Sequence, residues 1–205
     1  MNGQLKHRHN FVVLHALRFT IPLSLTLLRL LLAPVVLWLT WAEVPRDWYA
    51  VVLTAGFFSD YFDGVLARRL GVVRPWLRRL DSATDLIFYL CVLVAATSLE
   101  PLAVRSAAPG IVLLLLSEGA CITISLWRFG VLPATHSYSA KLYGLVLWIV
   151  LVGVLAFGWG ARAIWALTAV GLIANLEVIL ILLRSSTPPV DVSSVWALRT
   201  RERKE

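Results

Sequence analysis

Charged residues are scarce in this sequence. Asp, Glu, Lys and Arg make up 15% of its 205 residues, whereas 59% are hydrophobic, and the mean hydropathy is +0.79. Ordinary soluble domains contain about 25% charged residues, so this composition excludes one. The formal net charge is +7. In a membrane protein we expect the basic residues on loops and tails that meet anionic lipid, so this charge does not indicate binding to nucleic acid.

Cysteine and repetitive sequence are scarce as well. The two cysteines, Cys91 and Cys121, both lie in apolar runs, which predicts buried thiols and disfavours a disulfide or a zinc site. The sequence has no long-period repeat and no low-complexity segment, which argues against a repeat architecture. No small-residue cleavage site follows the first apolar segment, so a secretory signal is also disfavoured.

Long apolar runs are the dominant feature that is present. A helix of about 20 residues crosses the roughly 30 Å hydrocarbon core of a bilayer, and six runs approach this length. The predicted spans are residues 22–41, 48–70, 77–98, 108–127, 142–159 and 163–183. The preceding apolar segment, 11–20, is interrupted by His15 and Arg18, which predicts a short interfacial helix.

These runs predict an all-α, polytopic membrane protein with six transmembrane helices. Its expected parts are a basic N-terminal segment with the interfacial helix (1–20), a six-helix membrane domain (21–184) and a basic cytoplasmic tail (185–205). With the N-terminus inside, every Lys and Arg except Arg46, Arg105 and Arg162 falls on the inner side. The positive-inside rule therefore predicts an inner-membrane protein with both termini in the cytoplasm.

Four aspartates interrupt the second and third spans. Asp60 and Asp63 are three residues apart and Asp81 and Asp85 are four apart, so each pair lies on one face of its helix. Only about a dozen apolar residues precede Asp60, which covers about 18 Å of the bilayer core. We therefore expect the two pairs to face one another at the cytoplasmic side, in a water-filled cavity inside the inner leaflet.

Carboxylates held together in a low dielectric repel, so they need protons or cations. Oxygen-rich sites suit Mg²⁺, Mn²⁺ or Ca²⁺, and two ions about 4 Å apart are used for phosphoryl chemistry. Gly64 and Ala67 share a face with the first acidic pair and leave room for a ligand, while Arg68 can bind a phosphate with two hydrogen bonds. The stretch predicts a site for a metal-bound phosphate anhydride.

The spacing of these residues resembles the signature of the CDP-alcohol phosphotransferases, also called CDP-alcohol phosphatidyltransferases. The pattern reads Asp60-x2-Asp63-Gly64-x2-Ala67-Arg68, and then Asp81-x3-Asp85. The resemblance implies an integral membrane enzyme that transfers a phosphatidyl or phospho-alcohol group from a CDP-linked donor to an alcohol. Leu77 departs from the pattern, because the family has glycine four residues before the third aspartate.

The resemblance also implies roles for individual residues. One or two Mg²⁺ or Mn²⁺ ions would be bound by the aspartates of both pairs, and Asp85 would in addition be the general base. The nucleotide would be bound by residues of the second span. These residues are Asp60, Gly64, Ala67 and Arg68. A homodimer is plausible by the same resemblance.

The donor and acceptor are predicted from shorter matches. The opening of the first span, which ends at Arg29, resembles that of bacterial phosphatidylglycerophosphate synthases. It favours CDP-diacylglycerol as donor and glycerol 3-phosphate as acceptor, with inositol or inositol phosphate next. Arg29 either extends to lipid headgroups or binds a donor phosphate. Arg128 and Lys141 either bind the acceptor or serve the positive-inside topology.

Polar residues inside the later spans leave further alternatives open. Glu118 either pairs with a polar residue of another span or lines the acceptor site, and Asn175 and Glu177 are expected to face the bundle interior. Two rival functions also remain. One is a non-catalytic CDP-lipid-binding relative, which Leu77 favours, and the other is a divalent-cation transporter with a pore lined by aspartates.

Overall fold

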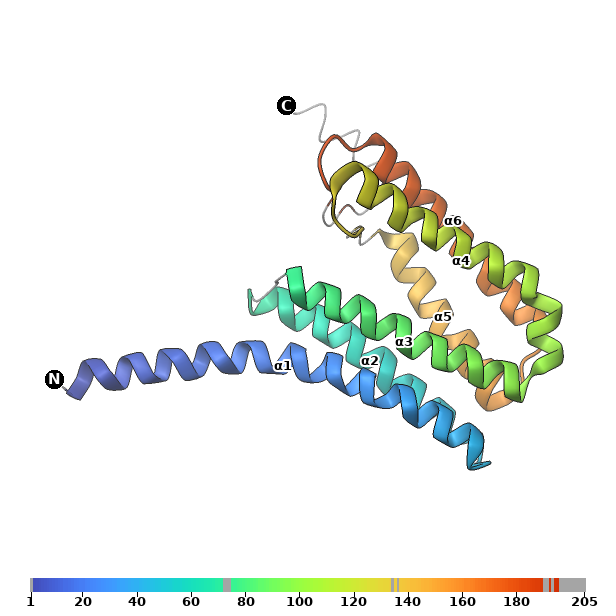
Figure 1. Ribbon diagram of the computed structural model, residues 1–205, viewed down its shortest axis with the longest axis horizontal. Coiled ribbons are helices and arrows are strands. Elements are labelled where there is room, and N and C mark those ends of the chain that lie inside the picture. The colour runs from blue at the N-terminus through green and yellow to red at the C-terminus, as the bar shows by residue number, and fades with distance from the viewer. Residues whose placement is uncertain are drawn as a thin grey trace. The chain divides into compact units, whose positions relative to one another are not determined.

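The computed structural model describes residues 2–71, 75–133, 135, 137–189, 192, 194 and 195, without the side chains of residues 2–19, 68, 75, 76, 78 and 79. All regular secondary structure in this part of the chain is α-helical (Figure 1). They are α1 (Asn2–Trp41), α2 (Asp47–Arg69), α3 (Pro75–Leu99), α4 (Pro101–Phe129), α5 (Tyr138–Phe157) and α6 (Ala161–Arg184).

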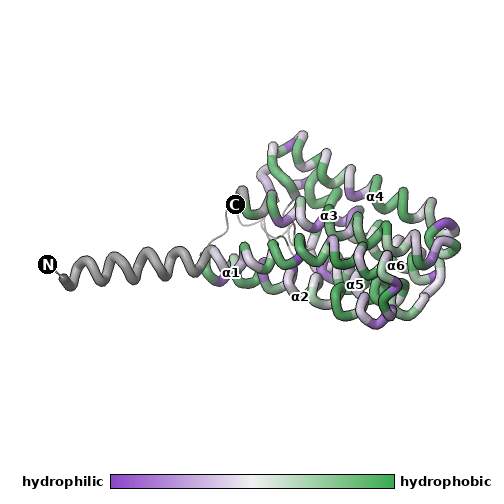
Figure 2. Tube along the Cα trace, turned by 60° about the horizontal axis from the view of Figure 1, so that its bottom comes forward, coloured by the Kyte–Doolittle hydropathy of each residue, from purple (hydrophilic) through white to green (hydrophobic). Residues whose placement is uncertain are grey.

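Each of the six helices contains a stretch long and apolar enough to cross a membrane. Between 22% and 44% of each stretch is buried inside the protein, so most of its apolar surface faces outward. Figure 2 shows hydrophobic residues along all the helices. Such a surface is stable only in lipid, because soluble proteins rarely expose large contiguous apolar areas. The predicted class, an all-α integral membrane protein with six spans, is confirmed.

The first helix differs from the prediction in one respect. Residues 2–41 form a single helix with Pro22 and Pro34 inside it, so the expected interfacial helix is the first part of α1 and not a separate element. Proline removes one backbone hydrogen bond and can bend a helix without ending it. Among the residues whose side chains the structure describes, the first candidate span covers Thr20–Trp41, which includes the predicted span 22–41.

The other helix ends follow local signals. Pro101 begins α4, seven residues before the predicted start of that span, because proline is tolerated in the first helical turn. Ser137 precedes α5, and its side chain accepts a hydrogen bond from the backbone N–H of Ala140. Gly130 ends α4 with a positive φ of 67°, and its N–H donates to the carbonyl of Leu126.

The chain forms two compact units, Met1–Leu99 and Glu100–Glu205. In the first unit, α1 lies beside both α2 and α3 (Figure 1). No Cα atom of α2 lies within 8 Å of a Cα atom of α3, among the residues that the structure describes. The two acidic helices are therefore joined mainly through α1 and through side chains.

In the second unit, α6 packs against both α4 and α5. Two glycines allow close packing there. A Cβ atom on Gly110 of α4 would lie 2.9 Å from the Trp165 ring of α6, and one on Gly171 of α6 would lie 2.5 Å from Leu114 of α4. Small residues at such contacts are typical of helix packing in membranes. The predicted division into segments 1–20, 21–184 and 185–205 stays a prediction.

Candidate functional site

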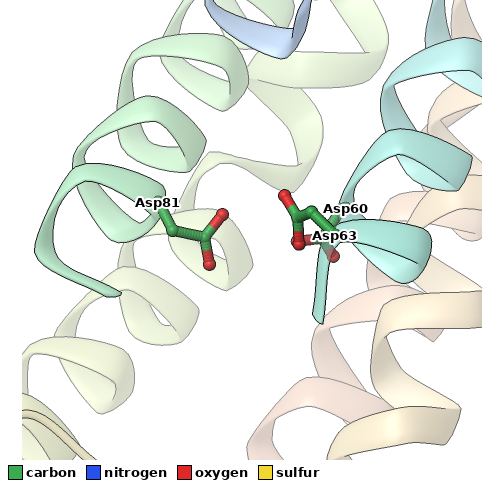
Figure 3. Close-up of side chains that lie close together, drawn as sticks. All are labelled: Asp60, Asp63 and Asp81. Carbon is green, nitrogen blue, oxygen red and sulfur yellow. The ribbon is translucent and has the colours of Figure 1, made fainter. Parts of the chain in front are cut away.

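The acidic residues converge as their spacing predicted. Asp60 and Asp63 of α2 point toward Asp81 of α3 (Figure 3). One carboxylate oxygen from each of these three residues lies within 4.8 Å of the others. Asp85, one turn further along α3, joins the same cluster through a shared partner on α1. The first unit therefore brings together all four predicted aspartates.

That shared partner is Arg29. Its Nη1 lies 3.0 Å from Oδ1 of Asp60 and also donates to Oδ1 of Asp85. Its Nη2 lies 2.6 Å from Oδ2 of Asp63 and 3.1 Å from Oδ1 of Asp81. The arginine side chain is 1% exposed, so it is buried at the centre of the cluster and does not extend toward lipid headgroups. The planar fork of a guanidinium suits such multiple contacts.

Thr26 supports this arrangement one turn before Arg29. Its hydroxyl lies 3.3 Å from Oδ2 of Asp63 and 3.2 Å from the carbonyl of Pro22, and the side chain is buried. Asp63 therefore has polar contacts with two residues of α1. The sequence reasoning missed Thr26, although its position three residues before Arg29 places it on the same helix face.

The carboxylates differ in their access to solvent. The Asp63 side chain is 6% exposed, whereas those of Asp60, Asp81 and Asp85 are 46%, 34% and 32% exposed. The cluster therefore has one deep member and three members that an incoming molecule can reach. Asp85 contacts Arg29 through Oδ1 and is one of the three accessible carboxylates.

A glycine and an aromatic ring close the space next to the cluster. Phe88 of α3 is buried, and its ring tip lies 2.7 Å from where a Cβ atom on Gly56 of α2 would be. Gly56 is four residues before Asp60, and Phe88 is three residues after Asp85, so this contact is about one turn deeper in the spans. The Phe88 ring therefore packs closely against α2 at Gly56, and no feature of the sequence beyond the small residue indicated this contact.

The remaining residues of the signature lie around the cluster. Gly64 and Ala67 are partly buried positions of α2, and the Arg68 side chain is outside the described residues. Leu77, which replaces the glycine of the family pattern, is 7% exposed on α3. It lies one turn before Asp81, and its side chain is packed inside the protein.

The donor set fits a hard divalent cation. Oxygens on opposite sides of a Mg²⁺ ion are about 4.2 Å apart, and those around Ca²⁺ about 5 Å apart, so the 4.8 Å grouping of three carboxylate oxygens matches this scale. Four carboxyl groups surround one guanidinium, which leaves acidic groups in excess. Arg29 Nε is buried and has no hydrogen-bond partner among the described residues. The cluster therefore combines an excess of acidic groups with one buried donor, Arg29 Nε, that has no partner in the described part of the chain.

The predicted acceptor residues both belong to the second unit. Arg128 at the end of α4 donates to carbonyls at the end of α6, at 3.0 Å to Leu182 and 3.3 Å to Ser185, and also to Leu183. It thus satisfies carbonyls that the helix leaves without partners. Lys141 is exposed near the start of α5, with its ammonium 5.5 Å from the centre of the Tyr138 ring. Their predicted role in acceptor binding stays a prediction.

The intramembrane polar residues of the second unit form pairs. The Tyr143 hydroxyl donates to Glu118 at 2.7 Å, which agrees with the alternative that Glu118 pairs with a residue of another span. Asn175 is buried and donates to Ser117 at 2.8 Å, as expected for a residue facing the bundle interior. Glu177 accepts a hydrogen bond from Ser139, at the start of α5.

Comparison with known proteins identifies the family. The family description CDP-alcohol phosphatidyltransferase matches residues 19–188, so the chain belongs to this family. A cardiolipin synthase (CMP-forming) from Streptomyces coelicolor is 39% identical over 83 residues, which cover 38% of this chain and 39% of the relative. The match thus spans well under half of the relative's length. No solved structure matches significantly. The family predicted from the acidic motif is confirmed.

Proposed function

We propose that this member of the CDP-alcohol phosphatidyltransferase family transfers a phosphatidyl group from CDP-diacylglycerol to a polar alcohol and releases CMP. The observation that carries the proposal is the convergence of four aspartates from α2 and α3 around one buried arginine. Such an acidic site would repel a diphosphate on its own, so it suits a donor that arrives with divalent cations. The family match supports a CDP-linked donor.

The aspartates would hold one or two Mg²⁺ or Mn²⁺ ions. Asp60, Asp63 and Asp81 offer the three grouped oxygens, and Asp85 adds a fourth carboxylate. When bound, such ions neutralise the charge of a diphosphate and stabilise the charge that develops as CMP leaves. The three partly exposed carboxylates are accessible to a substrate, whereas buried Asp63 anchors the group to α1.

Asp85 is the proposed general base. One of its oxygens takes the proton of the acceptor hydroxyl, and the hydroxyl oxygen attacks the β-phosphorus of the donor. A new phosphorus–oxygen bond forms to the acceptor, the bond to the bridging oxygen breaks, and CMP leaves with the electron pair. The Asp85 side chain is 32% exposed, so its carboxylate is accessible to an acceptor hydroxyl.

The nucleotide is proposed to bind along α2, at Asp60, Gly64, Ala67 and Arg68. Gly64 and Ala67 have small side chains, so a ligand can approach the helix backbone there. Leu77 is buried one turn before Asp81 on α3, so this position still favours the alternative of a non-catalytic CDP-lipid-binding relative.

Glycerol 3-phosphate is the first proposed acceptor, and inositol or inositol phosphate follows. Arg128 and Lys141 are the proposed acceptor-binding residues, and Arg29 the proposed contact to a donor phosphate. The relative from Streptomyces coelicolor is named for forming cardiolipin with release of CMP, so a phospholipid alcohol such as phosphatidylglycerol is the second class of acceptor. The distribution of Lys and Arg supports a site and termini that face the cytoplasm.

The test is CMP release by purified protein with labelled CDP-diacylglycerol, Mg²⁺ or Mn²⁺, and a panel of these acceptors. We expect release to require one acceptor and a divalent cation. Asp85→Asn should lower the rate by about 10²–10⁴-fold, the usual contribution of a positioned base. Asp47→Asn, an exposed aspartate at the start of α2, is the matched control and should retain the rate of the unmodified protein.

Other results would favour the rival functions. Near-normal turnover in Asp85→Asn would show that the base is assigned wrongly. Binding of CDP-diacylglycerol without CMP release, across the whole acceptor panel, would indicate a non-catalytic lipid-binding relative. Cation flux into liposomes without nucleotide would indicate a transporter, in which the aspartates line a pore.

A further inference from the structure

Arg29 uses the same carboxylates that are available for a divalent cation. Its two terminal nitrogens contact Asp60, Asp63, Asp81 and Asp85, and three of these residues form the oxygen group that suits a metal ion. Carboxylate oxygens bind Mg²⁺ at about 2.1 Å, which is closer than they approach a guanidinium. An ion on these oxygens would therefore place a divalent cation and the Arg29 guanidinium within a few ångströms of each other.

Because Arg29 is buried, a cation bound to the same carboxylates would be strongly repelled by the guanidinium. The side chain is 1% exposed, so water does not screen its charge from a neighbouring cation. Its described charged partners are the four aspartates, and its Nε is a buried donor without a partner in the described part of the chain. Among the residues that the structure describes, the four carboxylates are therefore the charged groups that hold the guanidinium.

We propose that Arg29 is a built-in competitor of the divalent cation, which exchanges with it for the carboxylates of α2 and α3. This inference rests on the proposed function, because it concerns the same metal site. Arg29 ties both acidic helices to α1 while it holds the carboxylates, and cation binding releases the guanidinium. The two released terminal nitrogens, together with the already unpaired Nε, can then bind an anionic phosphate that accompanies the cation.

The competition predicts a change in metal affinity that is independent of turnover. Mn²⁺ binding is measured by electron paramagnetic resonance on purified protein in detergent, without nucleotide. Arg29→Gln removes the competitor and one positive charge, so Mn²⁺ should bind about tenfold more tightly or better. Arg29→Lys keeps the charge but cannot contact all four carboxylates at once, so it should strengthen binding by about threefold. Arg46→Gln, at the opposite end of the first unit's spans, should leave the affinity unchanged.

Two further measurements keep the result clear. If Arg29→Gln aggregates, Mn²⁺ binding is compared between the single variant Asp60→Asn and the double variant Asp60→Asn, Arg29→Gln. The double variant has one negative charge fewer to neutralise than Arg29→Gln alone. Equal or weaker Mn²⁺ binding in the Arg29 variants would overturn the competition and leave the metal site intact. No Mn²⁺ binding in the unmodified protein, or binding that survives Asp81→Asn, would overturn the metal site of the proposed function and the competition with it.

Discussion

The two units of this protein treat polar groups inside a membrane helix bundle in opposite ways. The first unit gathers four acidic side chains around one arginine, and three of the acids remain partly exposed. The second unit connects its polar residues to one another by hydrogen bonds between helices, as in Tyr143 with Glu118 and Asn175 with Ser117. Pairs satisfied within the protein stabilise helix packing, whereas an excess of one charge requires an external partner. This contrast supports the proposal that the first unit binds the cations and the donor.

The largest expected effect comes from removing the arginine that holds the first unit together. Arg29→Gln should lower the free energy of unfolding by about 3 kcal/mol in the presence of a chelator, the low end for a broken buried ion pair because three carboxylates are partly solvated. Unfolding in mixed micelles, followed by circular dichroism, measures this change. A loss below about 0.5 kcal/mol would mean that the arginine contributes no more than an exposed ion pair.

The packing next to the acidic cluster should be the second most sensitive feature. Gly56→Leu would force the buried Phe88 ring to move, and overpacking of this kind costs about 1–3 kcal/mol. Gly119→Leu is the matched control, because no atom lies within 4 Å of a Cβ at that position of α4. Thermal unfolding of both variants checks the prediction. Equal midpoints would show that the ring can move aside freely.

A polar pair of the second unit should matter less. Asn175→Ala removes the hydrogen bond to Ser117, and such bonds in membrane proteins average about 0.6 kcal/mol, up to about 1.7 kcal/mol. We expect a loss of about 1 kcal/mol with the Mn²⁺ affinity unchanged. A double-mutant cycle with Ser117→Ala isolates the pair. A shift in Mn²⁺ affinity would contradict the proposal that the cation binds to the first unit alone.

The smallest expected effect is at the end of α6. Arg128→Gln removes donors to the carbonyls of Leu182 and Ser185, and the exposed position limits the loss to about 0.5–1 kcal/mol. If the arginine also binds the acceptor, the KM for that acceptor should rise while the KM for CDP-diacylglycerol stays constant. An unchanged acceptor KM, with a lower unfolding midpoint, would restrict Arg128 to its contact with α6.

Local sequence signals were sufficient for much of the fold. Hydropathy located all six spans, because the need to cross the apolar core acts on each helix separately. Helix ends were less certain: α4 begins at Pro101 and α1 continues through Pro22, since proline is compatible with a first turn and with a bent helix. The acidic faces of α2 and α3 were predicted because they depend only on the spacing within each helix.

The partners across helices were harder to predict. Arg29 was expected either to extend to lipid headgroups or to bind a donor phosphate, and the structure buries it among the aspartates. The contact between Gly56 and Phe88 and the hydrogen bond between Tyr143 and Glu118 were not specified by any motif. A polar residue in an apolar run shows that a partner is needed, but it does not identify that partner.

The sequence by itself therefore determined that this is a six-span membrane protein with two acidic helix faces and the signature of a CDP-alcohol phosphatidyltransferase. Hydropathy and helical periodicity depend only on residues close together in the sequence, so they can be read without knowing the tertiary contacts. Only the tertiary structure decided that Arg29 lies at the centre of the acidic cluster, because its contacts reach residues 34, 52 and 56 positions away in the chain. Residues so far apart in the sequence come into contact only because α2 and α3 both pack against α1.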